Sequence, residues 1–147
     1  MTENFVNLES ARTEEQKLLM KKIMEDGVCP FCKEHFKDYH PKTILRETEH
    51  WFFTENISPY VGTKYHFLFV SKPTHISQPS DLSSEAIVDL FALLNKAIDE
   101  NKILGGSFLM RFGDPKHNGS SVEHLHAHLI VGDVNDPDHE PVRVKLG

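Results

Sequence analysis

Apolar residues recur at helical spacing in two stretches of the chain. The first lies between Thr13 and Asp26, and Gly27 is a suitable end for a helix. Its apolar positions are Leu18, Leu19, Ile23 and Met24. The second follows Asp81-Leu-Ser-Ser-Glu85, where a short polar side chain can cap the first turn, and runs to about Asn101. Its apolar face is expected to contain Ile87, Leu90, Phe91, Leu94 and Ile98.

Shorter stretches have the β-branched and aromatic composition of strands. Pieces of strand are expected within 43–54 and over 65–71, 106–112 and 122–131, with a last short strand at 142–144. Residues 36–41 are expected to form a loop, as are 56–63 and 113–121, where Gly, Pro and Asn favour turns. The order of helix, strands, helix and strands predicts an α+β fold with a mostly antiparallel sheet.

The length of the chain indicates one domain. Its 147 residues fall within the about 100–200 typical of a domain, which is enough to bury a core without disulfides. The hydrophobic content of 39% and charged content of 26% are those of an ordinary soluble protein. We therefore expect a single domain over residues 1–147, with residues 1–28 as an N-terminal extension that contains the first helix.

The formal net charge is −6. A broad surface for duplex DNA requires clustered Lys and Arg, so this charge disfavours a nucleic-acid partner but leaves room for a local anion site. Residues 1–12 lack the apolar core of a signal peptide, and no run of 18 apolar residues suggests a membrane span. The expected location is the cytoplasm, with no membrane partner.

Three histidines alternate with apolar residues in His124-Leu-His126-Ala-His128. A strand would place the three imidazoles on one face and the residues between them toward the core. Buried imidazoles need hydrogen-bond or metal partners, so the cluster indicates a functional site. A different metal enzyme and a fortuitous cluster remain alternatives. Metallo-β-lactamase-type sites are disfavoured, because His128 stands where they place Asp.

The segment 119–132 resembles the motif of the histidine triad (HIT) family, His-φ-His-φ-His-φ-φ with φ apolar, preceded by a Gly/Ser loop. The resemblance extends upstream, because Asn56-Ile-Ser-Pro59 is similar to the family's nucleoside pocket and 66–75 to the strand that follows. It covers about residues 29–132. It implies a HIT-like fold, with a mostly antiparallel sheet of about five strands and flanking helices in a single HIT domain, and it implies a homodimer.

The resemblance also implies an activity. The chain would be a nucleotide hydrolase or nucleotidyl transferase whose substrate is a purine nucleotide, such as a nucleoside phosphate, phosphoramidate or dinucleoside polyphosphate. His126 would attack the α-phosphorus and form a covalent nucleotidyl-histidine, since neutral imidazole, with an unperturbed pKa of about 6.5, is a competent nucleophile. The implied catalytic residues are His126, His128, His66 and Ser121. The implied nucleotide contacts are Asn56, Ile57, Asn118, Gly119, Ser120, Ser121, His126 and His128.

Two positions depart from the family pattern. Asn56 stands where many members have Asp, and an amide accepts a hydrogen bond from ribose more weakly than a carboxylate does. The Asn that many members carry before the Gly/Ser loop is absent, and Arg111, Asp114 or Asn118 could substitute for it. Turn chemistry is the alternative role of Asn56, Asn118 and Ser121, and burial as a structural residue is that of His66.

Cys29 and Cys32 have C-x-x-C spacing, which in a cytosolic protein indicates a metal or redox site rather than a disulfide. A zinc site needs two further ligands. The local choice is His35 with His40, and the long-range choice is His75 with His124. The second resembles HIT branches with structural zinc. We therefore expect zinc, with no organic cofactor, bound by Cys29, Cys32, His75 and His124.

Other classes of function remain open. A non-catalytic nucleotide-binding regulatory module would keep the pocket, and a zinc-dependent interaction domain would centre on the C-x-x-C. The intact triad favours an enzyme, because binding alone does not need a histidine aimed at phosphorus. A deadenylase of DNA ends, as aprataxin is, is disfavoured by the net charge of −6.

Overall fold

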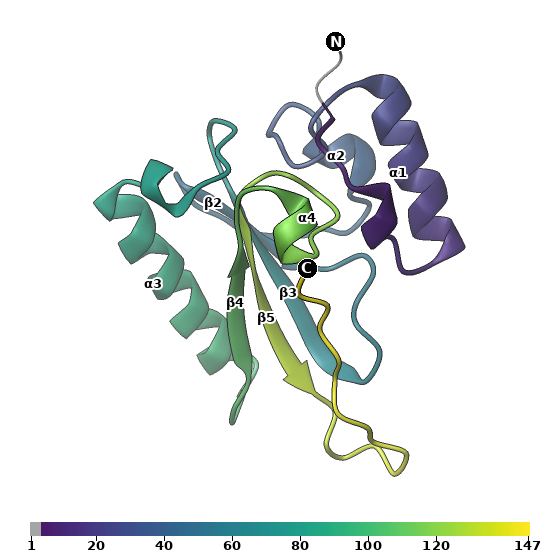
Figure 1. Cartoon of the computed structure of the whole chain (residues 1–147). Helices are drawn as coiled ribbons and strands as arrows, with labels where there is room; N and C mark the ends of the chain where they lie inside the picture. The colour runs from purple at the N-terminus through teal and green to yellow at the C-terminus, as the bar shows by residue number, and fades with distance from the viewer. Residues whose placement is uncertain (1–3) are drawn as a thin grey trace.

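One antiparallel sheet of five strands organises the chain (Figure 1). The computed structural model describes residues 4–147, so residues 1–3 of the expected N-terminal extension lie outside the described part. The strands are β1 (Ile44–Glu47), β2 (Trp51–Glu55), β3 (Thr63–Ser71), β4 (Ser107–Arg111) and β5 (His126–Gly132). The helices are α1 (Glu14–Asp26), α2 (Phe36–Tyr39), α3 (Ser84–Glu100) and α4 (Pro115–Asn118), with 3-10 turns η1 (Leu8–Ser10) and η2 (Pro79–Asp81). The predicted α+β fold is confirmed.

The strand order β1-β2-β3-β5-β4 inserts β5 between β3 and β4. The chain passes from β3 through α3 to β4, and β5 then pairs with both β3 and β4. In this register His128 is paired with Leu68 of β3 and Leu109 of β4. The strand that carries His126 and His128 therefore has a neighbour on both sides, which holds these two side chains on a rigid part of the sheet.

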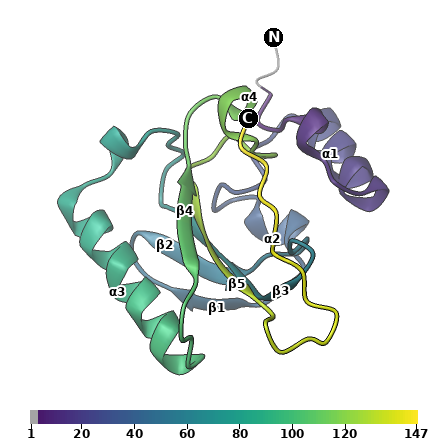
Figure 2. The same cartoon turned by 60° about the horizontal axis from the view of Figure 1, so that its bottom comes forward.

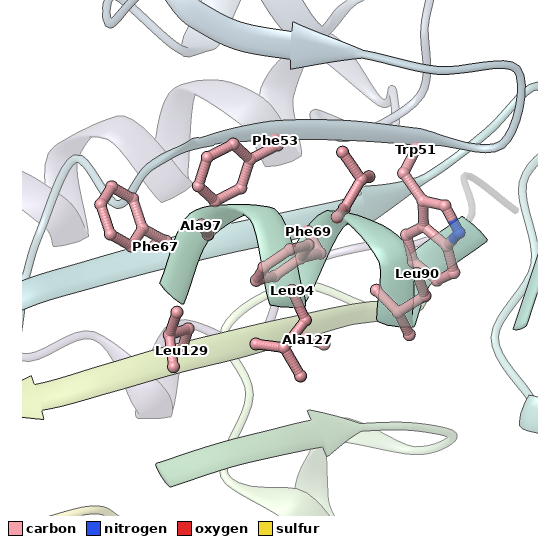
Figure 3. Close-up of a cluster of buried hydrophobic side chains, with 10 residues drawn as sticks. Trp51, Phe53, Phe67, Phe69, Leu90, Leu94, Ala97, Ala127 and Leu129 are labelled. Carbon is pink, nitrogen blue, oxygen red and sulfur yellow. The ribbon is translucent and has the colours of Figure 1, made fainter. Parts of the chain in front are cut away.

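The main core lies between α3 and one face of the sheet (Figure 3). Phe69 and Ala127, which are register partners, are 0% exposed and lie under the helix. Trp51 donates from its indole N–H to the carbonyl of Ala86 at 2.8 Å, which ties the sheet to α3. The buried members of this cluster are Trp51, Phe53, Phe67, Phe69, Leu90, Leu93, Leu94, Ala97, Ala127 and Leu129.

On the other side of the sheet from α3 lie α2 and, farther from the strands, α1 (Figures 1 and 2). Two smaller apolar clusters form there. One joins Met20 and Ile23 of α1 to Val122, and the other packs Phe36 of α2 on β2 and β3. Because strand side chains alternate, Ala127 faces α3 whereas His126 and His128 face this second side.

The helix α1 has the caps that its sequence predicts. The Thr13 hydroxyl accepts from the backbone N–H of Gln16, and Gly27 ends the helix in the left-handed conformation at φ 66°. The predicted apolar face was partly wrong, because Leu18 is 65% exposed and Met20 is buried. The buried residues of α1 are Met20 and Ile23, which pack on Val6 and Val122.

The same correction applies to α3, whose Ser83 cap accepts from the backbone N–H of Ala86. Ile87 and Phe91 are 45% and 51% exposed, whereas Ala86 and Ala97 are buried. The small side chains of Ala86 and Ala97 let the helix approach the sheet closely. The buried face of α3 is therefore turned away from Ile87 and Phe91.

Three expectations for the loops and ends were wrong. Residues 36–41 and 113–121 contain the short helices α2 and α4, the second of which is capped by Asp114 through the backbone N–H of Lys116. Residues 142–144 form no strand in the described chain. The C-terminal segment instead runs back toward α4 (Figure 2), and the carbonyl of Lys145 accepts from a side chain of β4, that of Arg111.

The strand expected over residues 122–131 starts later than predicted. Val122 makes only an isolated bridge with Val6, and His124 lies just before β5, which starts at His126.

Within residues 4–147, no helix has the length and apolar character needed to cross a membrane.

Candidate functional site

A cavity of about 360 Å³ lies between α1 and β5, a size typical of sites for small molecules. Its walls come from α1, the C-x-x-C turn, the loops that follow β2 and precede β5, and the C-terminal segment. Seven of the residues predicted for the site line it, namely Asn56, Ile57, Gly119, Ser120, Ser121, His126 and His128. The predicted residues His66 and Asn118 do not line the cavity but lie behind it.

His126 is 4% exposed and is held by a hydrogen bond from its own strand. Its Nδ1 lies 2.5 Å from the carbonyl oxygen of His124. A carbonyl can only accept, so Nδ1 carries the proton and Nε2 keeps a lone pair. Burial lowers the pKa of His126 to about 4, and the positive charge of Arg111 acts in the same direction. His126 is therefore neutral at physiological pH and has a free nucleophilic nitrogen.

A chain of hydrogen bonds fixes the proton on His128. The backbone N–H of Tyr60 donates to His66 Nδ1 at 3.1 Å, so neutral His66 carries its proton on Nε2. That nitrogen lies 2.8 Å from His128 Nδ1, which must accept. The proton of His128 is therefore on Nε2, a buried atom without a hydrogen-bond partner in the described residues.

The same histidines are kept neutral by their surroundings. Burial lowers the pKa of His66 to about 4, with the positive charges of Arg12 and Arg111 adding to the effect. Burial also lowers the pKa of His128 far below its ordinary value, and the neighbouring imidazoles of His126 and His66 and the positive charges of Arg111 and Arg12 act in the same direction. Neutral imidazoles are required by the hydrogen bonds described above, because each has one donor and one acceptor nitrogen.

Asn56 presents an amide N–H to the site rather than an acceptor. Its Oδ1 already accepts from the backbone N–H of Ser58 at 2.7 Å, which fixes the orientation of the amide. Its Nδ2 lies 3.1 Å from His66 Nε2, and since both atoms carry hydrogen this contact is not a hydrogen bond. An Asp at this position would offer acceptor oxygens only.

The loop before β5 is shaped by its own side chains. Asn118 accepts on Oδ1 from the Ser120 backbone N–H at 2.7 Å and donates to the carbonyl of Phe112 at 2.7 Å. The hydroxyl of Ser120 donates to the carbonyl of Val122 at 2.8 Å. These two side chains build the turn, and Gly119, Ser120 and Ser121 line the cavity.

Several residues that line the cavity were not predicted from the sequence. Tyr60 and Phe31 supply aromatic walls, and Arg12, Arg143 and Lys145 supply positive charge. Arg111 was weighed only as a replacement for the missing Asn. None of these residues belongs to a recognisable local motif, and Arg12 and Lys145 reach the site from segments distant in sequence.

A second cluster lies next to the cavity and could hold a metal ion. It consists of Cys29, Cys32, His75 and His124, whose ligand atoms all lie within 4.8 Å of one another. His124 Nδ1 lies 3.3 Å from the sulfur of Cys29, 3.6 Å from that of Cys32 and 3.2 Å from His75 Nδ1. These separations are close to those of the ligands around a tetrahedral ion with bonds of about 2.0–2.3 Å.

The protonation of His124 fits a metal ligand. Its Nε2 lies 2.8 Å from the carbonyl of Ser71 and must donate to it, which leaves a lone pair on Nδ1 directed at the cluster. Burial raises the pKa of the Cys29 thiol to about 12, so a cation is needed to stabilise the thiolate here. Phe31, between the two cysteines, packs edge-on against His126 with ring centroids 5.1 Å apart.

The local choice of ligands is not assembled. His40 is turned into the protein, where its Nε2 lies 2.8 Å from the hydroxyl of Thr54 and its ring stacks on Phe36. His35 is the residue before α2 and does not join the cluster. The geometry therefore favours the long-range set of ligands.

The family model of the HIT domain matches residues 37–135, which is more than half of the chain. The chain belongs to the HIT family. The match includes β1 to β5 and thus the whole sheet with the histidines of the cavity. The Cys pair and α1 lie before the matched region. No curated protein matches the chain significantly in sequence.

Solved structures of other HIT proteins are similar to this one. A HIT family hydrolase from Clostridium thermocellum is 27% identical with a TM-score of 0.57, over 79% of this chain and 96% of that chain. A histidine triad protein from Clostridium difficile is 26% identical with a TM-score of 0.55, over 76% and 96%. A zinc-bound histidine triad family protein from Mycobacterium smegmatis is 23% identical with a TM-score of 0.56, over 79% and 82%, and supports the fold.

Proposed function

We propose that this HIT protein is a nucleotide hydrolase or nucleotidyl transferase that uses His126 as its nucleophile. One observation carries the proposal. Within one cavity, His126 has its proton fixed on Nδ1, and the adjacent His128 has an N–H with no partner among the described residues. A nucleophilic nitrogen beside an unused donor suits attack on a phosphorus whose oxygens carry negative charge.

In the proposed reaction, His126 Nε2 forms a bond to the α-phosphorus while the bond from phosphorus to the leaving group breaks and its electron pair departs with the leaving group. The positive charge that develops on the imidazole is stabilised through Nδ1–H by the carbonyl of His124. The N–H of His128 donates to a non-bridging oxygen. Water, or another acceptor in a transferase, then displaces the nucleotide from nitrogen and restores neutral His126.

The nucleoside is proposed to bind in the part of the cavity beside Asn56 and Ile57. Leu19, Met20 and Ile23 of α1 add an apolar wall that suits a purine base. The backbone N–H groups around Gly119 and Ser121 would hold phosphate oxygens, in keeping with the acceptor-rich character of that group. The N–H of Asn56 would donate to a ribose oxygen.

We further propose that the Cys/His cluster binds a structural zinc ion. Cys₂His₂ is a common donor set for structural zinc, and all four positions would be filled by protein atoms. The ion would hold the C-x-x-C turn against the start of β5, and thereby Phe31 against His126. Its chemistry when bound is to stabilise two thiolates, and the catalytic steps do not involve it.

A homodimer is proposed on the basis of the sheet edge. The strand order leaves β4 with a neighbour on one side only, so the N–H and C=O groups of Ser107–Arg111 on its other side are available to a second copy. Light scattering on the purified protein would give twice the chain mass of 16.8 kDa for a dimer.

The test of the proposed activity compares wild type with His126→Ala on diadenosine tetraphosphate and adenosine 5′-phosphoramidate. We expect wild type to release AMP and His126→Ala to be inactive while it still binds AMP. The matched control is His139→Ala, at an exposed position outside the cavity, which should retain turnover. Mass spectrometry after an alkaline quench should detect adenylate on the peptide that contains His126.

Two outcomes would favour other functions. Binding of AMP without turnover by wild type would indicate a nucleotide-binding regulatory module. Absence of both binding and turnover, with loss of the fold after metal removal, would indicate a zinc-dependent interaction domain. The same assay with a chelator present separates these from the enzyme, because the proposed chemistry does not pass through zinc.

A further inference from the structure

Positive charge is concentrated on the wall of the cavity. Arg12, Arg111, Arg143 and Lys145 line it, and of the described residues that line it none is Asp or Glu. This occurs in a chain whose formal net charge is −6. Arg111 is buried and the other three are exposed at the cavity, so together they give the cavity a positive potential that favours an anionic ligand.

Arg111 is the most deeply placed of the four, at 4% exposed. It donates to the phenolic oxygen of Tyr60 at 2.7 Å, to the carbonyl of Lys145 at 2.9 Å and to the carbonyl of Asn118. These acceptors are all neutral, and no salt bridge involves Arg111 within residues 4–147. A buried guanidinium normally has an anionic partner, so a bound anion is the missing counter-charge.

Tyr60 holds a second arginine beside the first. The guanidinium carbon of Arg12 lies 4.5 Å from the centroid of the Tyr60 ring, and its Nη2 donates to the carbonyl of Ser58. One tyrosine therefore contacts one arginine through its face and the other through its hydroxyl. Both charges act on His66 and His128, whose pKa values they help to lower, so both lie close to the catalytic histidines.

The C-terminal segment brings in the other two cations. Arg111 anchors it by donating to the carbonyl of Lys145. Gly119 allows the close approach, because a Cβ on this residue, at φ +72°, would lie 2.6 Å from that same carbonyl oxygen. Arg143 and Lys145 are thus held at the mouth of the cavity next to the loop that precedes β5.

We propose that this cation cluster binds a linear polyphosphate that is attached to the α-phosphate and departs as the leaving group. The inference rests on the proposed function and specifies its substrate class as nucleoside polyphosphates. His128 and the backbone around Gly119 suffice for one phosphate, and an amine leaving group from a phosphoramidate has no use for four cations. Arg forks match phosphate oxygens well, and Arg111 has used only three of its five N–H groups in bonds to protein.

The cations would stabilise the negative charge that the leaving group gains in the reaction. When His126 Nε2 bonds to the α-phosphorus, the bond to the bridging oxygen breaks and its electron pair stays on the departing chain. The leaving polyphosphate therefore gains negative charge, which Arg12 and Arg111 stabilise without a proton donor. Hydrolysis of the nucleotidyl-histidine by water then yields a nucleoside monophosphate and free His126.

The first experiment measures binding without turnover. Titration calorimetry on His126→Ala protein compares inorganic tripolyphosphate with orthophosphate. We expect tripolyphosphate to bind at least tenfold more tightly, and Arg12→Gln in the same background to lose about tenfold of that affinity, the loss of one charge-assisted contact. Arg143→Gln is the second variant, because Arg111→Gln removes the anchor of the C-terminal segment. Lys64→Gln, with the same loss of charge outside the cavity, is the matched control.

The second experiment measures kcat/KM of wild type and Arg12→Gln on diadenosine tetraphosphate, ATP and adenosine 5′-phosphoramidate. We expect the ratio of either polyphosphate to the phosphoramidate to fall about tenfold in Arg12→Gln. Diadenosine tetraphosphate has a leaving group that ends in a second nucleoside, whereas the leaving group of ATP ends in a free phosphate. Comparing kcat/KM for the two shows which kind of leaving group the cations favour. An unchanged ratio, or equal losses of tripolyphosphate affinity in Arg12→Gln and Lys64→Gln, overturns the inference. If no substrate is turned over, the proposed function fails, and the calorimetry still decides whether the cluster binds polyphosphate.

Discussion

His66 on β3 and His128 on β5 are joined by a hydrogen bond of 2.8 Å between their imidazoles. Because the backbone N–H of Tyr60 occupies the other nitrogen of His66, the direction of this bond is set, and the proton of His128 is placed on Nε2. A backbone group thus determines, through two rings, which nitrogen of a cavity histidine can donate to a ligand.

This relationship predicts the effect of changing His66, a positioning residue. His66→Ala removes the donor to His128, so kcat should fall about tenfold to a hundredfold, as for other partners that orient a functional histidine, with a smaller change in KM. His66→Gln places an amide N–H near the position of Nε2 and should recover part of kcat. Equal kcat values for the two variants, at similar melting temperatures, would exclude the orienting role.

The Cys/His cluster predicts one zinc ion per chain. His75→Ala should lower the zinc content after dialysis and lower the melting temperature, because two thiolates and His124 would lose their fourth partner. His35→Ala, which removes one of the two histidines of the local alternative, should leave the zinc content unchanged. Elemental analysis by mass spectrometry measures both. The reverse pattern would show that the long-range ligand set is wrong.

A pH dependence of stability follows from His40. Burial lowers the pKa of His40 to about 4, with a contribution from Lys42, whereas in the unfolded chain it is about 6.5. Between these values the unfolded state binds more protons, so the free energy of unfolding decreases as the pH falls from about 6.5 to about 4, by about 3 kcal/mol from this residue. Urea unfolding at several pH values measures this slope.

The control for this prediction is a second histidine. His40→Gln retains a nitrogen that can bond to Thr54 but cannot be protonated, so the slope should become shallower by the share of His40. His117 is exposed, and His117→Gln should leave the slope as in wild type. A slope that is the same in His40→Gln and wild type would assign the acid sensitivity to other groups.

The packing of the sheet against α3 predicts a contrast between two phenylalanines. Phe69 on β3 is 0% exposed and packs against α3, and Phe69→Ala should cost about 3–5 kcal/mol of unfolding free energy. Phe91 on α3 is 51% exposed, so Phe91→Ala should cost less than about 1 kcal/mol. Chemical denaturation of both variants would show whether the buried face of α3 is the one described here, and similar costs would contradict it.

Much of the fold followed from local patterns. The helix α1 begins at the Thr13 cap and ends at Gly27, and β3 covers the apolar run around Phe67, because caps and periodicity act within a few residues. The buried faces of the helices were harder to predict. Phe91 fits the apolar stripe of α3 but lies outside the contact with the sheet, because the sheet covers less than the whole stripe.

Sequence alone therefore determined the α+β fold, the alternation that directs His126 and His128 to one face, and the set of candidate metal ligands. The tertiary structure decided how these parts meet. Cys32 and His75, 43 positions apart, lie 3.4 Å from each other, and Arg12 and Lys145 share the cavity wall with Arg111. The protons on His66 and His128 were likewise set by partners from other segments. Such contacts join residues that are far apart in the sequence and depend on how the elements pack in three dimensions. Local periodicity carries no information about the distances between such residues.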